Sequence, residues 1–354
     1  MTLSELALQV RLLAKFIAIL FGVIIVFVLL IVILLNLLKK PEPKTVYIDP
    51  IFGKLERLVF EKGEKQTGLK FVLDTVNGQL PETTPSANVY YIPESKSTLA
   101  YLSQIKNLAE SFGFNTEVVE AEPIGESWVK FEDATKGLEV NLKNYHFYFY
   151  HKPSETLENL IEATPEAKFT YLEDRFQETA REVLRSRGSY PTYLASGKIN
   201  LVYQSYDVND ERFYPTPSNQ VPQAVRIDFF RKDEDLNVVT PSFVESQNYV
   251  ILAPLNKDVD LIETKYTSFT KFDDNPGIYP LISSHEAWEK LTGGQAYTVA
   301  LDKNSKGKIK IKKIDLAYYD PETYQPYFQP IFVFIGDHDY RSYLPAVKQK
   351  YLVK

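Results

Sequence analysis

The residues best suited to chemistry form one short cluster near the C-terminus, Asp337, His338 and Asp339. Carboxylate oxygens are ligands for Ca²⁺ or Mg²⁺, and an imidazole nitrogen suits Zn²⁺. Adjacent residues of a tight turn cannot easily point at the same ion, however, and Asp-rich turns commonly join two strands. We therefore expect a strand connection at this position, with a metal-dependent hydrolase as an alternative.

Familiar catalytic patterns are otherwise absent from the sequence. Its 354 residues include no cysteine, and no G-x-S-x-G, H-E-x-x-H or Gly-rich phosphate loop occurs. His146 lies in an aromatic segment that resembles a strand, His151 lies at its exit, and His285 lies in the first turn of a short helical segment. Structural roles explain all three histidines. We expect a non-enzymatic protein without a metal or cofactor.

Residues that could bind a partner occur in the segment 320–330, DPETYQPYFQP. Proline stiffens this loop, and Tyr324, Tyr327 and Phe328 supply aromatic anchors of the kind that protein or glycan recognition uses. The alternative is that these rings fold back on a neighbouring sheet. We predict partner binding through Tyr324, Tyr327 and Phe328.

Two charged segments have simple structural interpretations. Residues 308–312, KIKIK, place lysines on one strand face and isoleucines on the other, which predicts a solvated sheet face or a protected edge strand. Contact with an anionic wall polymer or with lipid is the alternative. Residues 273–277, DDNPG, predict a turn, with a cation site as the alternative.

The elements that would position these residues follow from periodicity. Helical spacing occurs at 98–112, 169–187 and 285–291, each followed by glycine, and Ser283 or Ser284 can cap the third. Segments rich in β-branched and aromatic residues predict strands, which lie at 69–76, 137–140, 145–150, 199–206, 225–231, 249–254, 296–301, 309–319, 329–335 and 340–347.

This order of elements predicts an α+β fold. The simplest packing is about three units, each an antiparallel sheet covered by one helix. We place the first unit at residues 48–152, the second at 153–254 and the third at 255–354.

An apolar run precedes these units. Residues 16–38 contain no charged side chain, and as a helix they would span roughly 34 Å, enough to cross a bilayer. We predict an uncleaved single-pass anchor, with a short cytoplasmic tail at 1–15, a linker at 39–47 and the large domain outside the cell. The flanks of the anchor are basic on both sides and consist of Arg11, Lys15, Lys39 and Lys40.

Part of the C-terminal third resembles the YycH/YycI-type bacterial envelope regulators. The resemblance is carried by residues 279–291 (YPLISSHEAWEKL), 314–319 (IDLAYY) and 329–334 (QPIFVF), about a quarter of the chain. It implies PepSY-like units in a single-pass membrane protein, with its N-terminus inside the cell, that binds and restrains a sensor histidine kinase. The chain departs from the family in its longer N-terminal part and in Phe332, where members often have Trp. The apolar run also contains Gly22 without a small-x-x-x-small pair.

These features predict a non-enzymatic protein of the bacterial cell membrane that binds another envelope protein, such as a sensor or an assembly factor, and contacts lipid through residues 16–38. The formal net charge is −6 and basic residues gather around the apolar run, so the rest is acidic and unsuited to nucleic acid. The alternative function is a scaffold that binds wall polymer or glycan through Tyr324 and Tyr327 or through residues 308–312.

Overall fold

The computed structural model describes residues 17, 20–31, 47–66, 68–96, 101–152, 172–207, 209–255, 258–302 and 307–353. Contacts divide the chain into two units, residues 1–46 and 47–354, and each is described by itself. Where the first unit is described, residues 20–31 are helical.

The predicted membrane anchor is wrong by this structure. None of the helices in the described segments is both long enough and apolar enough to span a bilayer. The predicted single-pass topology and membrane localisation are therefore also wrong. The predicted lipid contact through residues 16–38 is untested and stays a prediction. The rest of the predicted span and its flanks (Arg11, Lys15, Lys39 and Lys40) lie outside the described residues, Ile17 excepted.

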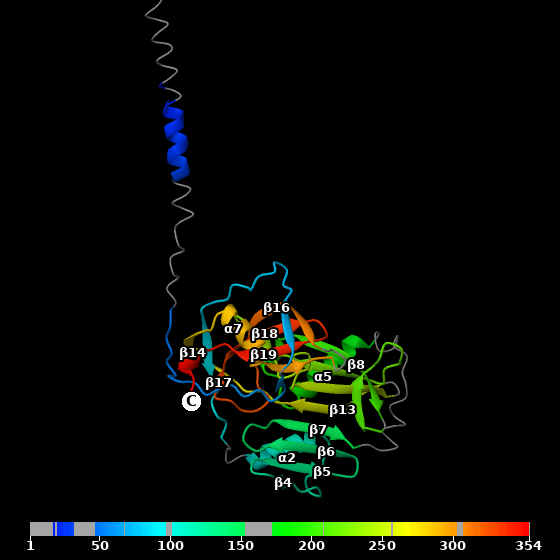
Figure 1. The fold of residues 1–354 in the computed structure, drawn as a ribbon. Coiled ribbons are helices and arrows are strands. Elements are labelled where there is room, and N and C mark those ends of the chain that lie inside the picture. Colours follow the sequence, from blue (N-terminus) through cyan, green and yellow to red (C-terminus); the bar gives the residue numbers. More distant parts are fainter. Residues whose placement is uncertain are drawn as a thin grey trace, which may run out of the picture. The chain divides into compact units, whose positions relative to one another are not determined.

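Nine of the described strands form one antiparallel sheet, which we call the antiparallel sheet (Figure 1). Its order is β4-β5-β6-β7-β13-β12-β10-β8-β9. The bounds are β4 Glu122–Ile124, β5 Trp128–Glu132, β6 Lys136–Asn141, β7 Phe147–His151, β8 Ile199–Asp207, β9 Arg212–Pro215, β10 Ala224–Phe229, β12 Tyr249–Leu255 and β13 Asp258–Tyr266.

Two helices cover one face of the antiparallel sheet. They are α2 (Tyr101–Ser111) and α5 (Glu173–Arg185). The buried side chains of α5 recur at helical spacing, and the alternate residues of the strands complete the core beneath both helices. That core contains Ile105, Ala109, Phe131, Leu138, Phe149, Phe176, Ala180, Leu184, Val225, Ile227 and Leu252 among others. A third helix, α6, spans Thr192–Ala195.

Seven of the described strands form a second sheet, which we call the mixed sheet. Its order is β1-β15-β19-β18-β16-β11, and β2 also pairs with β16; β2 and β11 run parallel to β16. The bounds are β1 Glu64–Lys65, β2 Lys70–Leu73, β11 Asn237–Val239, β15 Tyr297–Ala300, β16 Lys308–Tyr319, β18 Pro330–Gly336 and β19 Arg341–Pro345.

The mixed sheet packs against a helix that the sequence predicted well. Helix α7 (Ser284–Thr292) begins after Ser283, whose side chain accepts a hydrogen bond from the backbone N–H of Glu286. Ala287 and Leu291 of α7 are buried in the core with alternate residues of β16 and β18. The N-cap therefore confirms the predicted start of this helix. A 3₁₀ turn, Gln349–Tyr351, lies near the C-terminus.

Three more strands form a small sheet in the order β14-β3-β17. Their bounds are β3 Ser86–Tyr91, β14 Phe272–Pro280 and β17 Tyr327–Phe328. The predicted turn at 273–277 lies within β14, where the pairing with β3 shifts register between Phe272 and Gly277. The DDNPG segment is therefore a bulge in a strand and not a connection between strands.

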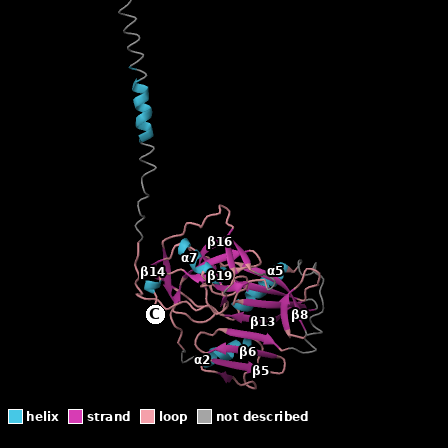
Figure 2. Ribbon diagram, viewed as in Figure 1, coloured by secondary structure: helices cyan, strands magenta, loops and turns pink. Residues whose placement is uncertain are grey.

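The predicted architecture of three PepSY-like units is wrong, because strands pair across the whole chain. Strand β7, expected in the first unit, pairs with β13, expected in the third. Strands β1 and β2 join the mixed sheet formed mainly by the C-terminal residues. Figure 2 shows how fully strands dominate the larger unit. The reason is that backbone pairing depends on partners distant in sequence, which local periodicity does not reveal.

Candidate functional site

A buried ion pair joins the antiparallel sheet to the mixed sheet. Arg231 follows the end of β10 and Asp320 follows the end of β16, and both are almost completely buried. The Nε of Arg231 lies 3.0 Å from Oδ1 of Asp320, and its second amino group donates to the carbonyl oxygen of Phe269. Burial alone would lower the pKa of Arg231. The Asp320 carboxylate and nearby tyrosines raise it by more, so the net shift of the pKa is upward. Arg231 therefore stays charged and fixes how the sheets meet.

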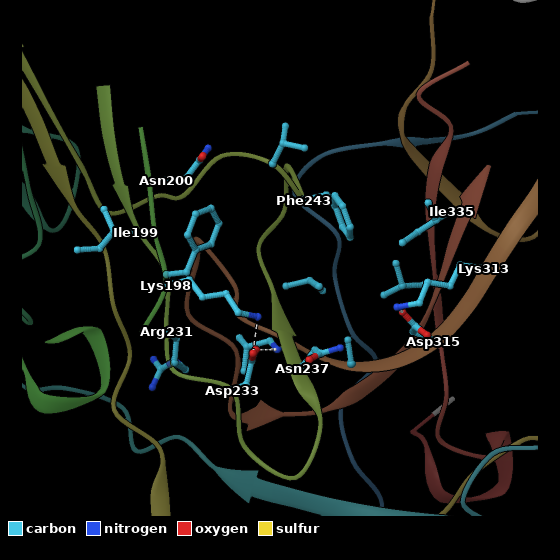
Figure 3. Close-up of a pocket in the computed structure, with 16 residues that line it drawn as sticks. Lys198, Ile199, Asn200, Arg231, Asp233, Asn237, Phe243, Lys313, Asp315 and Ile335 are labelled. Carbon is cyan, nitrogen blue, oxygen red and sulfur yellow. Dashed lines mark hydrogen bonds and ion pairs between the residues drawn. The ribbon is translucent and has the colours of Figure 1, made fainter. Parts of the chain in front are cut away.

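A cleft of about 510 Å³ lies beside this junction, and Figure 3 shows its walls. One wall comes from the start of β8 and the end of β10, and the other from β11, β16 and β18. The lining residues are Lys198, Ile199, Asn200, Phe230, Arg231, Asp233, Asn237, Val238, Val239, Phe243, Val244, Lys313, Asp315, Ala317, Val333 and Ile335.

The strand pleat explains which residues of β16 face the cleft. Lys313, Asp315 and Ala317 alternate with Ile314 and Leu316, which pack in the core that contains α7. Because successive side chains of a strand point to opposite faces, one strand supplies both a wall of the cleft and the core behind it.

Charged groups pair with one another at the edge of the cleft. Lys198 forms an ion pair with Asp233, and Lys313 forms one with Asp315 (Figure 3). Oδ1 of Asp233 also accepts a hydrogen bond from the backbone N–H of Val238 at 2.9 Å. Lys198 and Lys313 are largely exposed, so each pair stabilises the fold by less than about 1 kcal/mol. Their charges remain accessible to a ligand.

Phe243 points its ring toward the cleft from a turn (Figure 3). Its backbone adopts φ +65°, and its N–H donates to the carbonyl oxygen of Thr240. A bulky side chain in the left-handed region is strained by about 1–2 kcal/mol. The Arg341 guanidinium lies 5.2 Å from the ring and helps to hold it. The turn thus holds an aromatic side chain and the exposed Val244 at the cleft.

The three aromatic residues predicted to bind a partner have different surroundings in the structure. Phe328 is buried and stacks on Tyr318, with ring centroids 5.0 Å apart. Tyr327 packs on Phe52 at 5.4 Å. Tyr324 is 37% exposed, and its hydroxyl donates to the carbonyl oxygen of Ile92 at 3.0 Å. The rings therefore fold back on neighbouring strands, and Tyr324 lines a separate hollow of about 430 Å³.

Asp337, His338 and Asp339 form the connection between β18 and β19. Oδ1 of Asp337 accepts a hydrogen bond of 2.9 Å from the backbone N–H of Lys310. His338 and Asp339 both have positive φ, as is common in tight turns. Within the described ranges, no group of three or more His, Cys, Asp or Glu residues is arranged to hold a metal.

The lysine segment at 308–312 behaves as its alternation predicts. Ile309 and Ile311 are fully buried, whereas Lys308, Lys310 and Lys312 are exposed. The first four residues of this segment pair with β2, so they are not a free edge.

His146 lies in the hollow that Tyr324 also lines, and it is buried. Its Nε2 lies 2.9 Å from the carbonyl oxygen and 3.2 Å from the backbone N of Ser268, so either tautomer finds a partner. Burial lowers the pKa of His146 to about 4. The imidazole is therefore neutral at ordinary pH, and its contacts are structural.

Sequence reasoning missed the cleft because its residues come from segments that are far apart. Lys198, Asp233 and Phe243 occur in stretches with no recognisable motif. A usable signal was the alternation of Lys313 and Asp315 with Ile314 and Leu316, which predicts that both share a face of one strand once the pattern has shifted by one residue at Lys312 and Lys313.

Comparisons with known proteins leave the family open. No family model matches the sequence, and no curated protein matches it. A crystal structure of an uncharacterised protein from Eubacterium rectale ATCC 33656 aligns with a TM-score of 0.36 and 10% identity, over 79% of this chain and 88% of that chain. A likeness this weak carries no argument about function. The resemblance to YycH/YycI-type regulators stays a prediction.

Proposed function

We propose that this protein is a non-enzymatic binding protein that holds a segment of another protein in the cleft between its two large sheets. The observation that carries the proposal is the composition of the cleft. Val238, Val333 and Ile335 line it with apolar surface, and paired charges border that surface. An apolar centre within a polar rim is the common anatomy of a protein-binding site.

The size of the cleft favours a side-chain anchor. A volume of about 510 Å³ is within the range of pockets that enclose a ligand of modest size, and it can accept one or two large apolar side chains of a partner. Phe243 and Val244 project from a turn and can pack on such an anchor. Few well-buried contacts then supply most of the binding free energy.

The charges at the rim support binding over catalysis. Asp233 and Asp315 each have a lysine partner, so neither offers an unpaired base. Both signs are present at the mouth. A partner segment with an apolar residue between residues of mixed charge would therefore meet complementary groups on each side.

The test uses peptides selected from a random displayed library against the full-length protein. Their affinity is measured by fluorescence anisotropy for the parent, for Val244→Lys and for Val118→Lys. Both valines are exposed, at 56% and 76%, and Val118 lies outside the cleft lining. Burial of a valine stabilises a complex by about 1.5 kcal/mol or more, so we expect Val244→Lys to weaken binding at least about tenfold. Val118→Lys should leave the affinity within about twofold.

Two results would count against the proposal. Selected peptides without an apolar anchor would contradict the role of the apolar lining. Equal affinity for the parent and Val244→Lys would place binding elsewhere. A salt titration adds a second readout, because Lys313→Glu should change the salt dependence of peptides that contact the rim.

A further inference from the structure

The face of the antiparallel sheet opposite α2 and α5 carries a cluster of tyrosines, which we call the tyrosine face. Its members are Tyr148 and Tyr150 of β7, Tyr206 of β8 and Tyr249 of β12. The rings of Tyr148 and Tyr150 are stacked, with centroids 5.1 Å apart. Tyr249 packs in a small buried cluster with Ile251 and Ile262, whereas Tyr148, Tyr150 and Tyr206 line a hollow at the surface.

A glycine on the neighbouring strand makes room for one of these rings. Gly137 of β6 is paired with Tyr150 of β7. A Cβ atom placed on Gly137 would lie only 2.5 Å from the Tyr150 ring. The tyrosine ring therefore covers the glycine backbone across the strands. Any larger residue at position 137 would displace the ring.

The hollow on the tyrosine face has a volume of about 390 Å³. Tyr148, Tyr150 and Tyr206 line it together with six polar residues, which are His151, Gln204, Glu211, Arg212, Arg226 and Glu263. An adjacent hollow of about 160 Å³ shares Arg226 and includes Tyr249. The two hollows together can hold a ligand longer than a single ring.

Two charged groups of the tyrosine face, Glu263 and Arg226, have partners within the protein. The hydroxyls of Tyr249 and Tyr148 both hydrogen-bond to Glu263, and burial raises the pKa of Glu263. The Arg226 guanidinium lies 3.7 Å from the centre of the Tyr249 ring and donates to Asp228 at 3.0 Å. Because these charges are already compensated, a charged ligand would gain little from them.

One polar group in the floor remains without a partner. Gln204 is 5% exposed, and in the described part of the chain its Oε1 makes no hydrogen bond. A buried acceptor without a donor is destabilising by about 1–3 kcal/mol. Gln204 lines the hollow, so a hydroxyl of a bound ligand can supply the donor.

We propose that the tyrosine face binds a neutral oligosaccharide. The apolar C–H faces of sugar rings pack on tyrosine rings, and sugar hydroxyls both donate and accept hydrogen bonds. Those properties match an unpartnered acceptor at Gln204 beside the guanidinium of Arg226. Strands β8 and β10, the latter with the residues that follow it, contribute to both sites, but no residue lines both the cleft and this hollow, so each site can be tested by its own variants.

The experiment titrates the full-length protein with maltohexaose, cellohexaose and hexa-N-acetylchitohexaose by isothermal titration calorimetry. At least one sugar should bind saturably. Gln204→Leu and Tyr150→Ala should each weaken it at least about tenfold. Gly137→Ala should also weaken it, because the added Cβ displaces the Tyr150 ring without removing it. Tyr214→Ala is the matched control: Tyr214 is exposed on β9, next in sequence to Phe213 of the hollow and hence on the opposite face.

Three results would overturn the proposal: no saturable binding of any of the three sugars at millimolar concentration, binding that all the tyrosine-face variants leave unchanged, or displacement of the sugar by the peptides that occupy the cleft. Circular dichroism of each variant confirms that it is folded. Val244→Lys should retain sugar binding, which separates failure of this site from failure of the cleft.

Discussion

Replacement of Asp320 by asparagine tests the junction that shapes the cleft. The amide introduced by Asp320→Asn would have nearly the shape of the carboxylate but would leave the Arg231 guanidinium, which is 3% exposed, without its counter-charge. Removal of one partner of a buried pair typically costs about 3–5 kcal/mol. Arg231 would keep the Phe269 carbonyl and the ring of Tyr193, which lies 4.2 Å away. We therefore expect Asp320→Asn to lower the free energy of unfolding by about 3 kcal/mol, the lower end of that range.

The assay is urea unfolding of the full-length protein, followed by both tyrosine fluorescence and circular dichroism so that coincident transitions justify a two-state treatment. Asp315→Asn is the matched control, because it removes a carboxylate from the partly exposed pair with Lys313 and should change the free energy of unfolding by less than about 1 kcal/mol. The double variant Arg231→Met, Asp320→Leu should recover at least half of the loss, since it removes both charges.

The reasoning is refuted if Asp320→Asn destabilises the protein no more than Asp315→Asn does. It is also refuted if the double variant is as unstable as the sum of the two single variants. Either result would mean that Arg231 and Asp320 do not act as a coupled pair.

Three further predictions concern individual side chains. The folded state holds the pKa of His146 near 4, below its ordinary 6.5, so it favours the neutral form; His146 should contribute stability above pH 6.5 that falls by up to about 3 kcal/mol as pH drops to 4. In acid denaturation curves, His146→Gln should lose this part of the slope, whereas His285→Gln, at an exposed position, should retain it. Phe243→Gly should be more stable than Phe243→Ala by about 1 kcal/mol in urea unfolding, because glycine tolerates φ +65°; the opposite order would contradict the strain. Ser283→Ala should lower the free energy of unfolding by about 1 kcal/mol through loss of the α7 cap, and Ser284→Ala should not; equal effects would argue against the cap.

Local structure in this protein was predictable where one segment determines it. The Ser283 cap and the glycines after it bound α7, and the alternation of lysine and isoleucine fixes which face of β16 is buried. The turn at Asp337 followed from its residue types. In each case the deciding contacts lie within a few residues.

Sheet membership was not predictable in the same way. Strand β13, residues 258–266 (DVDLIETKY), loses its alternation of polar and apolar residues at Leu261 and Ile262, and its residues Ile262 and Glu263 line the hollow of the tyrosine face. Without its partners β7 and β12, the segment lacks a strong strand signal. The pairing of β13 with β7 and β12 joins strands that their order in the sequence places in three separate units.

The candidate sites were harder still, because each needs two sheets or several strands to come together. The loop with Tyr324 had the composition of a recognition segment, yet its rings are used for packing. For the apolar run at 16–38, hydropathy predicted a membrane span, whereas none of the helices in the described residues is long and apolar enough to cross a bilayer.

The most direct test of the account is hydrogen exchange measured by mass spectrometry on the full-length protein, with and without a peptide selected for binding. The account predicts new protection at the cleft walls, in residues 198–200, 237–244, 313–317 and 333–335. Unchanged exchange at these four segments, with protection at other parts of the chain, would contradict the central claim that the cleft holds a partner.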